Sequence, residues 1–237
     1  HEELAQALGS LIYLYRLSDS VFNDDDVHSV LTGFDMTVLR AYYDPALANG
    51  MTRNQVAQRL PLILSLINPR GDRLSSNPLP ATPRTWIDAV QTALGPGSGA
   101  AERRNAAARA LKIAKQQGWR DHRLGFSHYA MGRLLQSYDS AQAHTQFLYA
   151  DRVFRQTPLA GPHRAFVATQ LSAHAISAGR GQEALNLINP QLATAAKYEN
   201  AALLSSLMLL RAEALELVNR PQEAADTRLD SLGWARY

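Results

Sequence analysis

The stretch PHRAFVATQLSAHAISAGRGQEALNLINPQLATAAKY, residues 162–198, decides the fold of this chain. Its apolar side chains are mostly alanine and leucine, and they do not follow the strict alternation of a strand. The triplet Gly179-Arg180-Gly181 interrupts the pattern, and glycine commonly follows the last turn of a helix. The stretch therefore predicts two helices joined by a tight turn. Alanine favours this arrangement because its helix propensity is high and its small side chain lets helices approach closely.

The same pattern extends through most of the chain. Residues 101–237 contain 27 alanines, about a fifth of the segment, whereas valine and isoleucine are sparse. Breaks at Gly118, at residues 157–162 and near Asn200 predict four helical hairpins, at residues 84–117, 121–157, 162–198 and 200–232. Their turns are expected at Gly95-Pro96-Gly97, Asp139-Ser140, Gly179-Arg180-Gly181 and Asn219-Arg220-Pro221. The predicted fold class is all-α.

These hairpins resemble the tetratricopeptide repeat (TPR) family, whose 34-residue unit pairs two helices with small and aromatic residues at set positions. In the third hairpin, Leu171-Ser172 stands where the family has Leu-Gly, Gly179 closes the first helix and Ala184 opens the second. The equivalent alanines of the four hairpins are Ala107, Ala143, Ala184 and Ala224. Their spacings of 36, 41 and 40 residues exceed the family's unit, so an irregular helical bundle remains the alternative.

The resemblance implies a right-handed superhelix over residues 84–237, with a concave groove lined by the first helix of each hairpin. Such a groove suits a peptide or a helical segment of a partner protein. Residues 1–68 do not fit the repeat and are predicted to form an N-terminal helical cap or small bundle, because a helical stack must cover its terminal apolar face. The proline-rich run PRGDRLSSNPLPATP, residues 69–83, is predicted to be a linker.

Three helices are predicted within residues 1–68. The first spans about residues 2–17, where apolar residues repeat at spacings of three and four. The second begins at the run Asp24-Asp25-Asp26, because acidic side chains stabilise the N-terminus of a helix dipole. The third begins at Thr52, where Gln55 completes a capping box, and ends at Asn68.

The composition excludes several classes of protein. With 46% apolar residues and a net charge of +3, the 237-residue chain is too apolar to be mainly disordered. It has no cysteine, which excludes disulfides and thiolate chemistry and fits an exported protein. Because the first residue is His1 rather than methionine, we expect a processed or cropped chain, and a periplasmic or secreted location is favoured over a cytoplasmic one. No apolar run reaches the length of a transmembrane helix.

No motif indicates catalysis, a cofactor or a metal. Histidines cluster between His122 and His174, but none pairs at the spacing of helical metal ligands, and H-E-x-x-H is absent. The acidic run after Asn23 lacks the glycine and glutamate of a calcium loop, and the glycine run at residues 95–99 lacks the lysine of a P-loop. Basic residues interleave with acidic ones, so no nucleic-acid partner is expected. The chain is predicted not to be an enzyme.

The candidate site is instead the groove. The residues projected onto its inner face are Leu124, Ser127, His128, Met131, Leu135, Phe166, Thr169, Gln170, Ala173, Ser177, Ser206, Leu209 and Glu213. This set contains no lysine, arginine or asparagine, so we expect it to bind an apolar segment, such as an amphipathic helix, rather than a free acidic C-terminus. Met131 and Phe166 are the predicted anchors. The alternative function is that of a helical accessory or ligand-sensing domain of a larger enzyme or regulator.

Overall fold

The computed structural model describes residues 15–23, 25, 27–73 and 79–234. Within these ranges the chain forms α-helices and two short 3-10 helices and contains no strand, which confirms the predicted all-α class. The chain divides into two compact units, His1–Ala81 and Thr82–Tyr237, each with its own internal contacts. The helix predicted at residues 2–17 falls mostly outside the described residues. No helix in the described part of the chain is long and apolar enough to span a bilayer.

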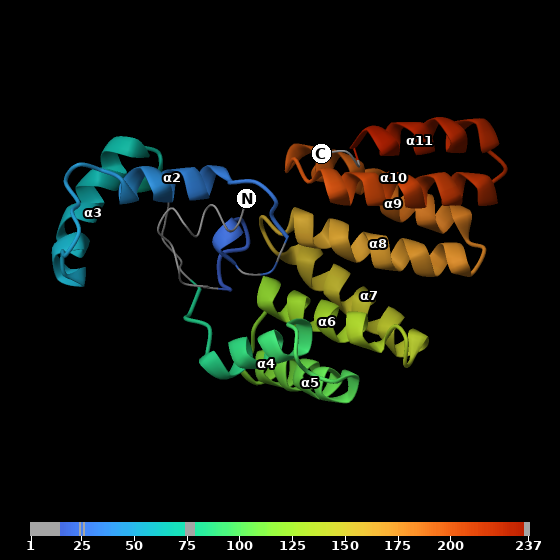
Figure 1. The fold of residues 1–237 in the computed structure, drawn as a ribbon, viewed down its shortest axis with the longest axis horizontal. Helices are drawn as coiled ribbons and strands as arrows, with labels where there is room; N and C mark the ends of the chain where they lie inside the picture. Colours follow the sequence, from blue (N-terminus) through green and yellow to red (C-terminus); the bar gives the residue numbers. More distant parts are fainter. Residues whose placement is uncertain (1–14, 24, 26, 74–78, 235–237) are drawn as a thin grey trace. The chain divides into compact units, whose positions relative to one another are not determined.

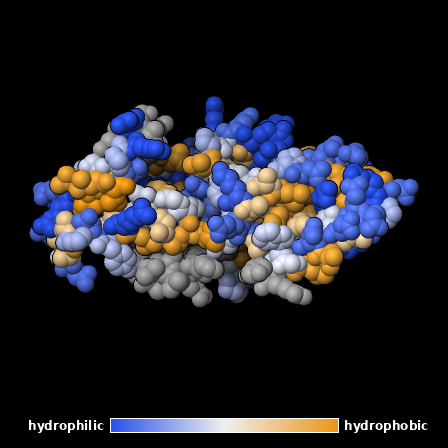
Figure 2. All heavy atoms as spheres, turned by 90° about the horizontal axis from the view of Figure 1, so that it is seen from above, coloured by the Kyte–Doolittle hydropathy of each residue, from blue (hydrophilic) through white to orange (hydrophobic). Residues whose placement is uncertain are grey.

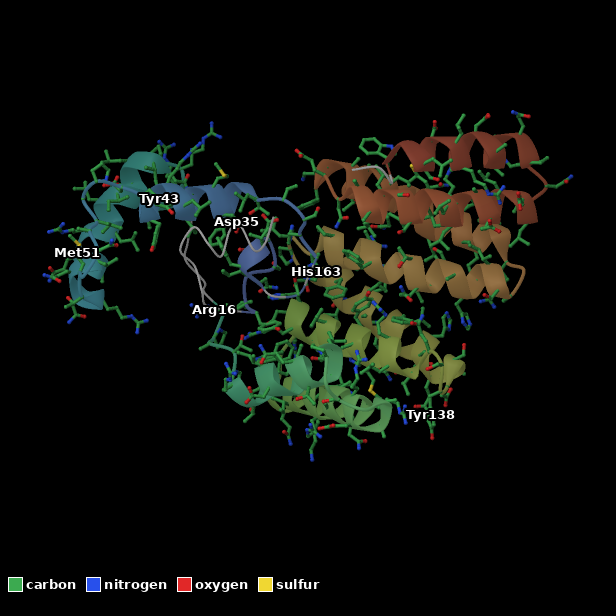
Figure 3. The ribbon with its side chains drawn as sticks, in the orientation of Figure 1. Arg16, Asp35, Tyr43, Met51, Tyr138 and His163 are labelled. Atoms are coloured by element: carbon green, nitrogen blue, oxygen red, sulfur yellow. The ribbon has the colours of Figure 1, made fainter. Side chains whose placement is uncertain are left out.

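Unit 1 contains the 3-10 helix η1 (Val21–Asn23), helix α2 (Gly33–Tyr42), helix α3 (Arg53–Ile67) and the 3-10 helix η2 (Gly71–Arg73). The buried carboxylate of Asp35, at the start of α2, organises the segment before it (Figure 3). It accepts hydrogen bonds from the Ser20 hydroxyl at 2.5 Å, the Val21 N–H at 3.2 Å and the Thr32 N–H at 2.8 Å. One side chain thereby satisfies three donors and ties η1 to α2.

The predicted start of the second helix was wrong. The helix begins at Gly33, after an N-cap at Thr32, and not at the acidic run Asp24-Asp25-Asp26. Thr32 and Asp35 form a reciprocal capping box, which fixes the helix start locally. Asp25 instead accepts the Val27 N–H at 3.3 Å in a turn. Acidic residues stabilise turns as well as helix N-termini, so the run alone could not distinguish the two.

The predicted start and end of the third helix are confirmed. Thr52 accepts the Gln55 N–H, and the Gln55 side chain accepts the Thr52 N–H at 2.8 Å, so both halves of the capping box form. The helix ends at Ile67, before Asn68 and Pro69, where the sequence changes from apolar to turn-forming residues.

Unit 2 is a stack of four consecutive helix pairs (Figure 1). The pairs are α4 (Arg84–Leu94) with α5 (Ala100–Gln116), α6 (His122–Leu135) with α7 (Ser140–Gln156), α8 (Gly161–Ser177) with α9 (Gly181–Lys197), and α10 (Ala201–Leu217) with α11 (Pro221–Trp234). Each helix packs against the next one along the chain, and α8 also contacts α10. The helices and turns lie within a few residues of the positions expected from the sequence.

Small residues lie where these helices come closest. Ala107, Ala143, Ala184 and Ala224, which stand at equivalent positions of the four second helices, are all buried. Glycine plays the same part in α6. A Cβ atom on Gly125 would lie 2.6 Å from the ring of Phe154, and one on Gly132 would lie 2.6 Å from the ring of Phe147. The absence of a side chain at these positions lets two phenylalanine rings pack against α6.

Candidate functional site

The residues projected onto the groove do not form one continuous surface. Ser127 is fully buried, accepts a hydrogen bond from the Trp86 indole at 3.0 Å and donates to the Arg123 carbonyl at 2.8 Å. His128 is also buried, with Nδ1 2.7 Å from Oε1 of Gln146. Both side chains point into contacts between helices, so the structure places them in the interior and not on an open face.

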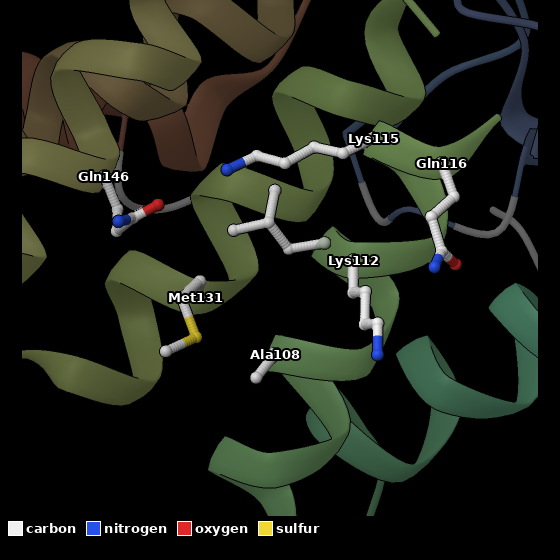
Figure 4. Close-up of a pocket in the computed structure, with 7 residues that line it drawn as sticks. Ala108, Lys112, Lys115, Gln116, Met131 and Gln146 are labelled. Atoms are coloured by element: carbon white, nitrogen blue, oxygen red, sulfur yellow. The ribbon is translucent and has the colours of Figure 1, made fainter. Parts of the chain in front are cut away.

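Met131 does line an open pocket. This pocket, of about 460 Å³, lies between α5, α6 and α7 and is called the lysine pocket below. Its lining residues are Ala108, Leu111, Lys112, Lys115, Gln116, Met131 and Gln146. Figure 4 shows the two lysines extending from α5, with Met131 on α6 and Gln146 on α7. The pocket therefore combines an apolar interior with two cations and two amides.

Within the described residues, the two cations of this pocket are not paired with carboxylates. No carboxylate in the described part of the chain lies within ion-pair distance of Lys112 or Lys115. Helix α5 itself carries five basic residues and one acid, Glu102, a net charge of 5 − 1 = +4. Lys112 and Lys115 are three positions apart, so they lie on one face of the helix.

His128 contacts the pocket indirectly, through a hydrogen bond to the lining residue Gln146. With the Gln146 oxygen facing the ring, Nδ1 of His128 donates the hydrogen bond, which leaves the amide N–H groups of Gln146 available. Burial lowers the pKa of His128, the hydrogen bond to Gln146 opposes this, and the nearby Lys115 lowers it further. The ring is therefore neutral at pH 7. The two ammonium groups and the N–H groups of Gln146 are hydrogen-bond donors, and the Gln116 amide offers both a donor and an acceptor.

A second, smaller pocket contains three more of the projected residues. A cavity of about 170 Å³ between the end of α6, α7 and α8 is lined in part by Gln170, Ala173 and Ser177. Gln170 accepts a hydrogen bond from the Gln136 amide at 2.6 Å, and the rings of His144 and His174 stack with their centroids 4.1 Å apart. Burial lowers the pKa of His144, and His174 lowers it further. Side chains that already contact each other surround this cavity.

The remaining projected residues are dispersed. Phe166 packs partly buried against the core of α8 to α11, and Thr169 donates to the Phe166 carbonyl at 2.7 Å. Glu213 is exposed and lies 2.8 Å from Arg228. These residues therefore do not contribute to the lysine pocket, and Met131 is the projected residue that does.

Sequence reasoning missed the two lysines because it projected only the first helix of each hairpin onto the groove. Both lysines come from α5, the second helix of the first pair. A signal was present, since Ala108, Leu111, Lys112 and Lys115 recur at helical spacing and place two cations beside apolar positions. Their approach to Met131 depends on how α5 packs against α6, which spacing within α5 does not reveal.

Unit 1 contains an apolar groove of its own. A hollow of about 720 Å³ between α2 and α3 is lined by Gly33, Phe34, Thr37, Val38, Ala41, Tyr42, Leu47, Val56, Leu60, Leu64 and Asn68. Large apolar side chains also lie exposed on these helices, among them Tyr42, Leu62 and Leu66. Figure 2 shows hydrophobic side chains gathering over the α2–α3 end of the drawing. Within the described residues of both units, no group of three or more His, Cys, Asp or Glu side chains is placed to hold a metal ion.

Comparison with known proteins concerns unit 1 alone. Residues 1–62 match the family model described as "Protein of unknown function (DUF2927)". The match ends inside α3, so it covers no residue of the helix-pair stack. Neither the comparison with curated proteins nor the comparison with solved structures gives a match.

Proposed function

We propose that the stack of α4 to α11 is a TPR-like right-handed superhelix that binds a peptide or helical segment of a partner protein. The packing of consecutive helix pairs supports this proposal, because every pair contacts the following pair and first helices also contact one another, as α8 contacts α10. Stacked helix pairs of this kind present extended surfaces along which a partner segment can lie. The role is one of recognition and not of catalysis.

The lysine pocket is the observation that carries the proposal. It is open, it is about 460 Å³ in volume, and Met131 contributes a flexible apolar side chain to its lining. Methionine adapts its shape to a bound side chain, and open apolar pockets with a few polar groups are common binding sites. Met131 is therefore the anchor in this proposal. Phe166, whose ring packs against the core, contributes to stability.

A second candidate function is that of an accessory domain. In this case unit 2 is a helical accessory part of a larger enzyme or regulator that includes unit 1. The division of the chain supports it, because unit 1, which holds the family match, and unit 2 are separate compact units. Hydrogen exchange on the whole chain distinguishes the two candidates. Exchange that changes in unit 1 when a peptide binds unit 2 supports an accessory role, and changes confined to unit 2 support an independent binding module.

Calorimetry with a panel of peptides tests the main proposal. The panel contains amphipathic helical peptides with blocked ends and peptides with a free acidic C-terminus. We expect the amphipathic peptides to bind the whole chain, and Met131→Ala to weaken binding roughly ten-fold or more through the loss of an apolar anchor. Phe166→Ala, checked for folding, is expected to lower stability and leave affinity unchanged. Binding that requires the free terminal carboxylate, or binding indifferent to Met131, contradicts the proposal.

A further inference from the structure

We propose that the lysine pocket selects an acidic amphipathic helix: a partner segment whose apolar face contacts Met131 and Leu111 and whose Asp or Glu side chains pair with Lys112 and Lys115. This inference rests on the proposed function and adds the chemistry of the partner to it. Three observations support it: the net positive charge of α5, which no ion pair in the described residues offsets at Lys112 and Lys115, the hydrogen-bond donors of the pocket, and the spacing of the two lysines.

The first observation is a contrast in charge pairing within unit 2. Arg155 and Arg164 share Asp151, while Arg220 pairs with Glu223 and Arg228 with both Glu213 and Glu216. Lys112 and Lys115 have no such carboxylate in the described residues, although α5 carries a net charge of +4. An acidic partner would supply the missing counter-charges, and charge complementarity favours correct partners and rejects basic ones.

The second observation is the direction of the hydrogen-bonding groups. The lysine ammonium groups are donors only, and His128 occupies the Gln146 oxygen, which leaves the N–H groups of this amide. A carboxylate, which only accepts hydrogen bonds when ionised, matches this set, and bonds between charged groups are stronger than neutral ones. A basic or purely apolar segment would leave these donors unpaired.

The third observation is geometry. Lys112 and Lys115 are about one helical turn apart on a face that also carries Ala108 and Leu111, so two apolar groups are followed by two cations along about two turns. A partner helix with acidic residues three or four positions apart, next to an apolar stripe, reproduces this spacing. The match is to side chains along a helix, not to a single terminal carboxylate.

Fluorescence anisotropy with three blocked peptides of about five helical turns tests the proposal. The peptides share an apolar face of leucine and methionine, and the positions that flank this face carry glutamate, glutamine or lysine. We expect the glutamate peptide to bind roughly ten-fold or more tightly than the glutamine peptide, and the lysine peptide to bind weakest. The advantage of the glutamate peptide should shrink as ionic strength rises, because salt screens exposed charges.

The matched variants are Lys112→Gln with Lys115→Gln, and Lys197→Gln as a control. Lys197 lies on α9 beside the ring of Tyr198 and away from the pocket lining. All three lysines of the chain are thus covered by the two variants. The double variant should remove the preference for glutamate and leave the affinity of the glutamine peptide unchanged, while Lys197→Gln should change neither. Thermal melting establishes that both variants remain folded.

Carbodiimide coupling supplies an independent readout. This reagent joins a lysine amine to a carboxylate only when the two groups are in contact, and the chain offers only Lys112, Lys115 and Lys197 besides its terminal amine. Peptide mapping should find the glutamate peptide attached to Lys112 or Lys115. Attachment to Lys197 or to the terminal amine alone contradicts the proposal.

The outcomes also distinguish the peptide-binding function from the preference for an acidic partner. If the glutamate and glutamine peptides bind equally and the double variant has no effect, the acidic partner is wrong but the peptide-binding function stands. If none of the three peptides binds the whole chain, both are wrong. Loss of glutamate-peptide preference in the double variant, together with coupling to Lys112 or Lys115, supports both.

Discussion

The first two helix pairs, α4 to α7, bury aromatic rings and a charged side chain, whereas the core cluster of α8 to α11 consists of alanine, leucine and isoleucine. In the first half, Trp86 and Trp119 pack edge to face with centroids 5.5 Å apart, and the guanidinium of Arg123 lies 4.0 Å from the Trp119 ring. In the last half, the buried residues of the core cluster are aliphatic, and Phe166 packs partly buried against them. The repeated helix geometry therefore does not require one kind of core.

The two halves of unit 2, α4 to α7 and α8 to α11, also differ in whether their ion pairs are buried or exposed. Arg123 is buried and forms a two-point ion pair with Asp121, through contacts of 3.1 and 2.8 Å. Burial raises the pKa of Asp121, but the hydrogen bonds and charge of Arg123 outweigh it and hold the pKa below its usual value. In the last half, Arg228 and its two glutamate partners lie at the surface. The difference matters for mutation, because removal of Arg123 leaves the Asp121 carboxylate without its partner in a largely buried site, whereas removal of Arg228 leaves its glutamate partners in water.

The largest expected effect comes from removing that buried ion pair. Arg123→Ala leaves Asp121 without its partner and removes packing against Trp119, so we expect a loss of about 3–5 kcal/mol in the free energy of unfolding. The surface variant Arg228→Ala should change the urea midpoint little, because water and salt screen exposed pairs. Urea titration of both variants measures the contrast. Equal urea midpoints for the two variants would contradict the expected difference between the buried and the exposed ion pair.

Overpacking probes the aliphatic half. Ala184→Phe inserts a ring into a buried contact of α9, so we expect a loss of roughly 1–3 kcal/mol. The control is Ala196→Phe on the same helix, where the side chain is exposed. A clear drop in urea midpoint for Ala184→Phe alone confirms that α9 is packed as tightly as the aromatic half. A core that accepts the ring without loss would be loosely packed.

A smaller effect is expected where glycine meets an aromatic ring. Gly132→Ala would place a Cβ atom 2.6 Å from the ring of Phe147, and the strain of about 1–3 kcal/mol outweighs a gain of about 1 kcal/mol in helix propensity. We expect a net loss of roughly 1 kcal/mol. In the last half, Gly233→Ala meets nothing within 4 Å, so only the propensity gain remains. Thermal melting should shift in opposite directions for the two variants.

The smallest expected effect is a dependence of stability on pH that arises in the first half. The pKa of His128 is lowered in the folded state, whereas in the unfolded chain it is about 6.5. The unfolded state therefore binds the proton first, so the free energy of unfolding should fall as pH drops below about 6.5 and should not depend on His128 above it. His128→Gln should flatten this slope relative to wild type in urea titrations at pH 7 and pH 5. An unchanged slope would mean that other groups cause it.

Much of the fold was predictable because its signals are local. Turn residues such as Gly179 and Asn219 lie between helices where the sequence placed them, and the alanines equivalent to Ala184 are buried. The capping box of Thr52 and Gln55 also formed as expected, since its partners are three residues apart. The start of α2 was missed because an acidic run can stabilise either a turn or a helix N-terminus. The helix starts instead where Thr32 and Asp35 form a capping box.

The site was less predictable because it depends on contacts between helices. The sequence alone determined that residues 84–234 form helices in pairs, because helix propensity, helix ends and small contact residues are properties of neighbouring positions. Only the tertiary structure decided that the side chains of Ser127 and His128 lie in the protein interior and not on the groove. It also decided that Lys112 and Lys115 of the first helix pair line a pocket with Met131 of the second. The rotation of each helix about its axis is set by how side chains of different helices interlock, and no single helix records it.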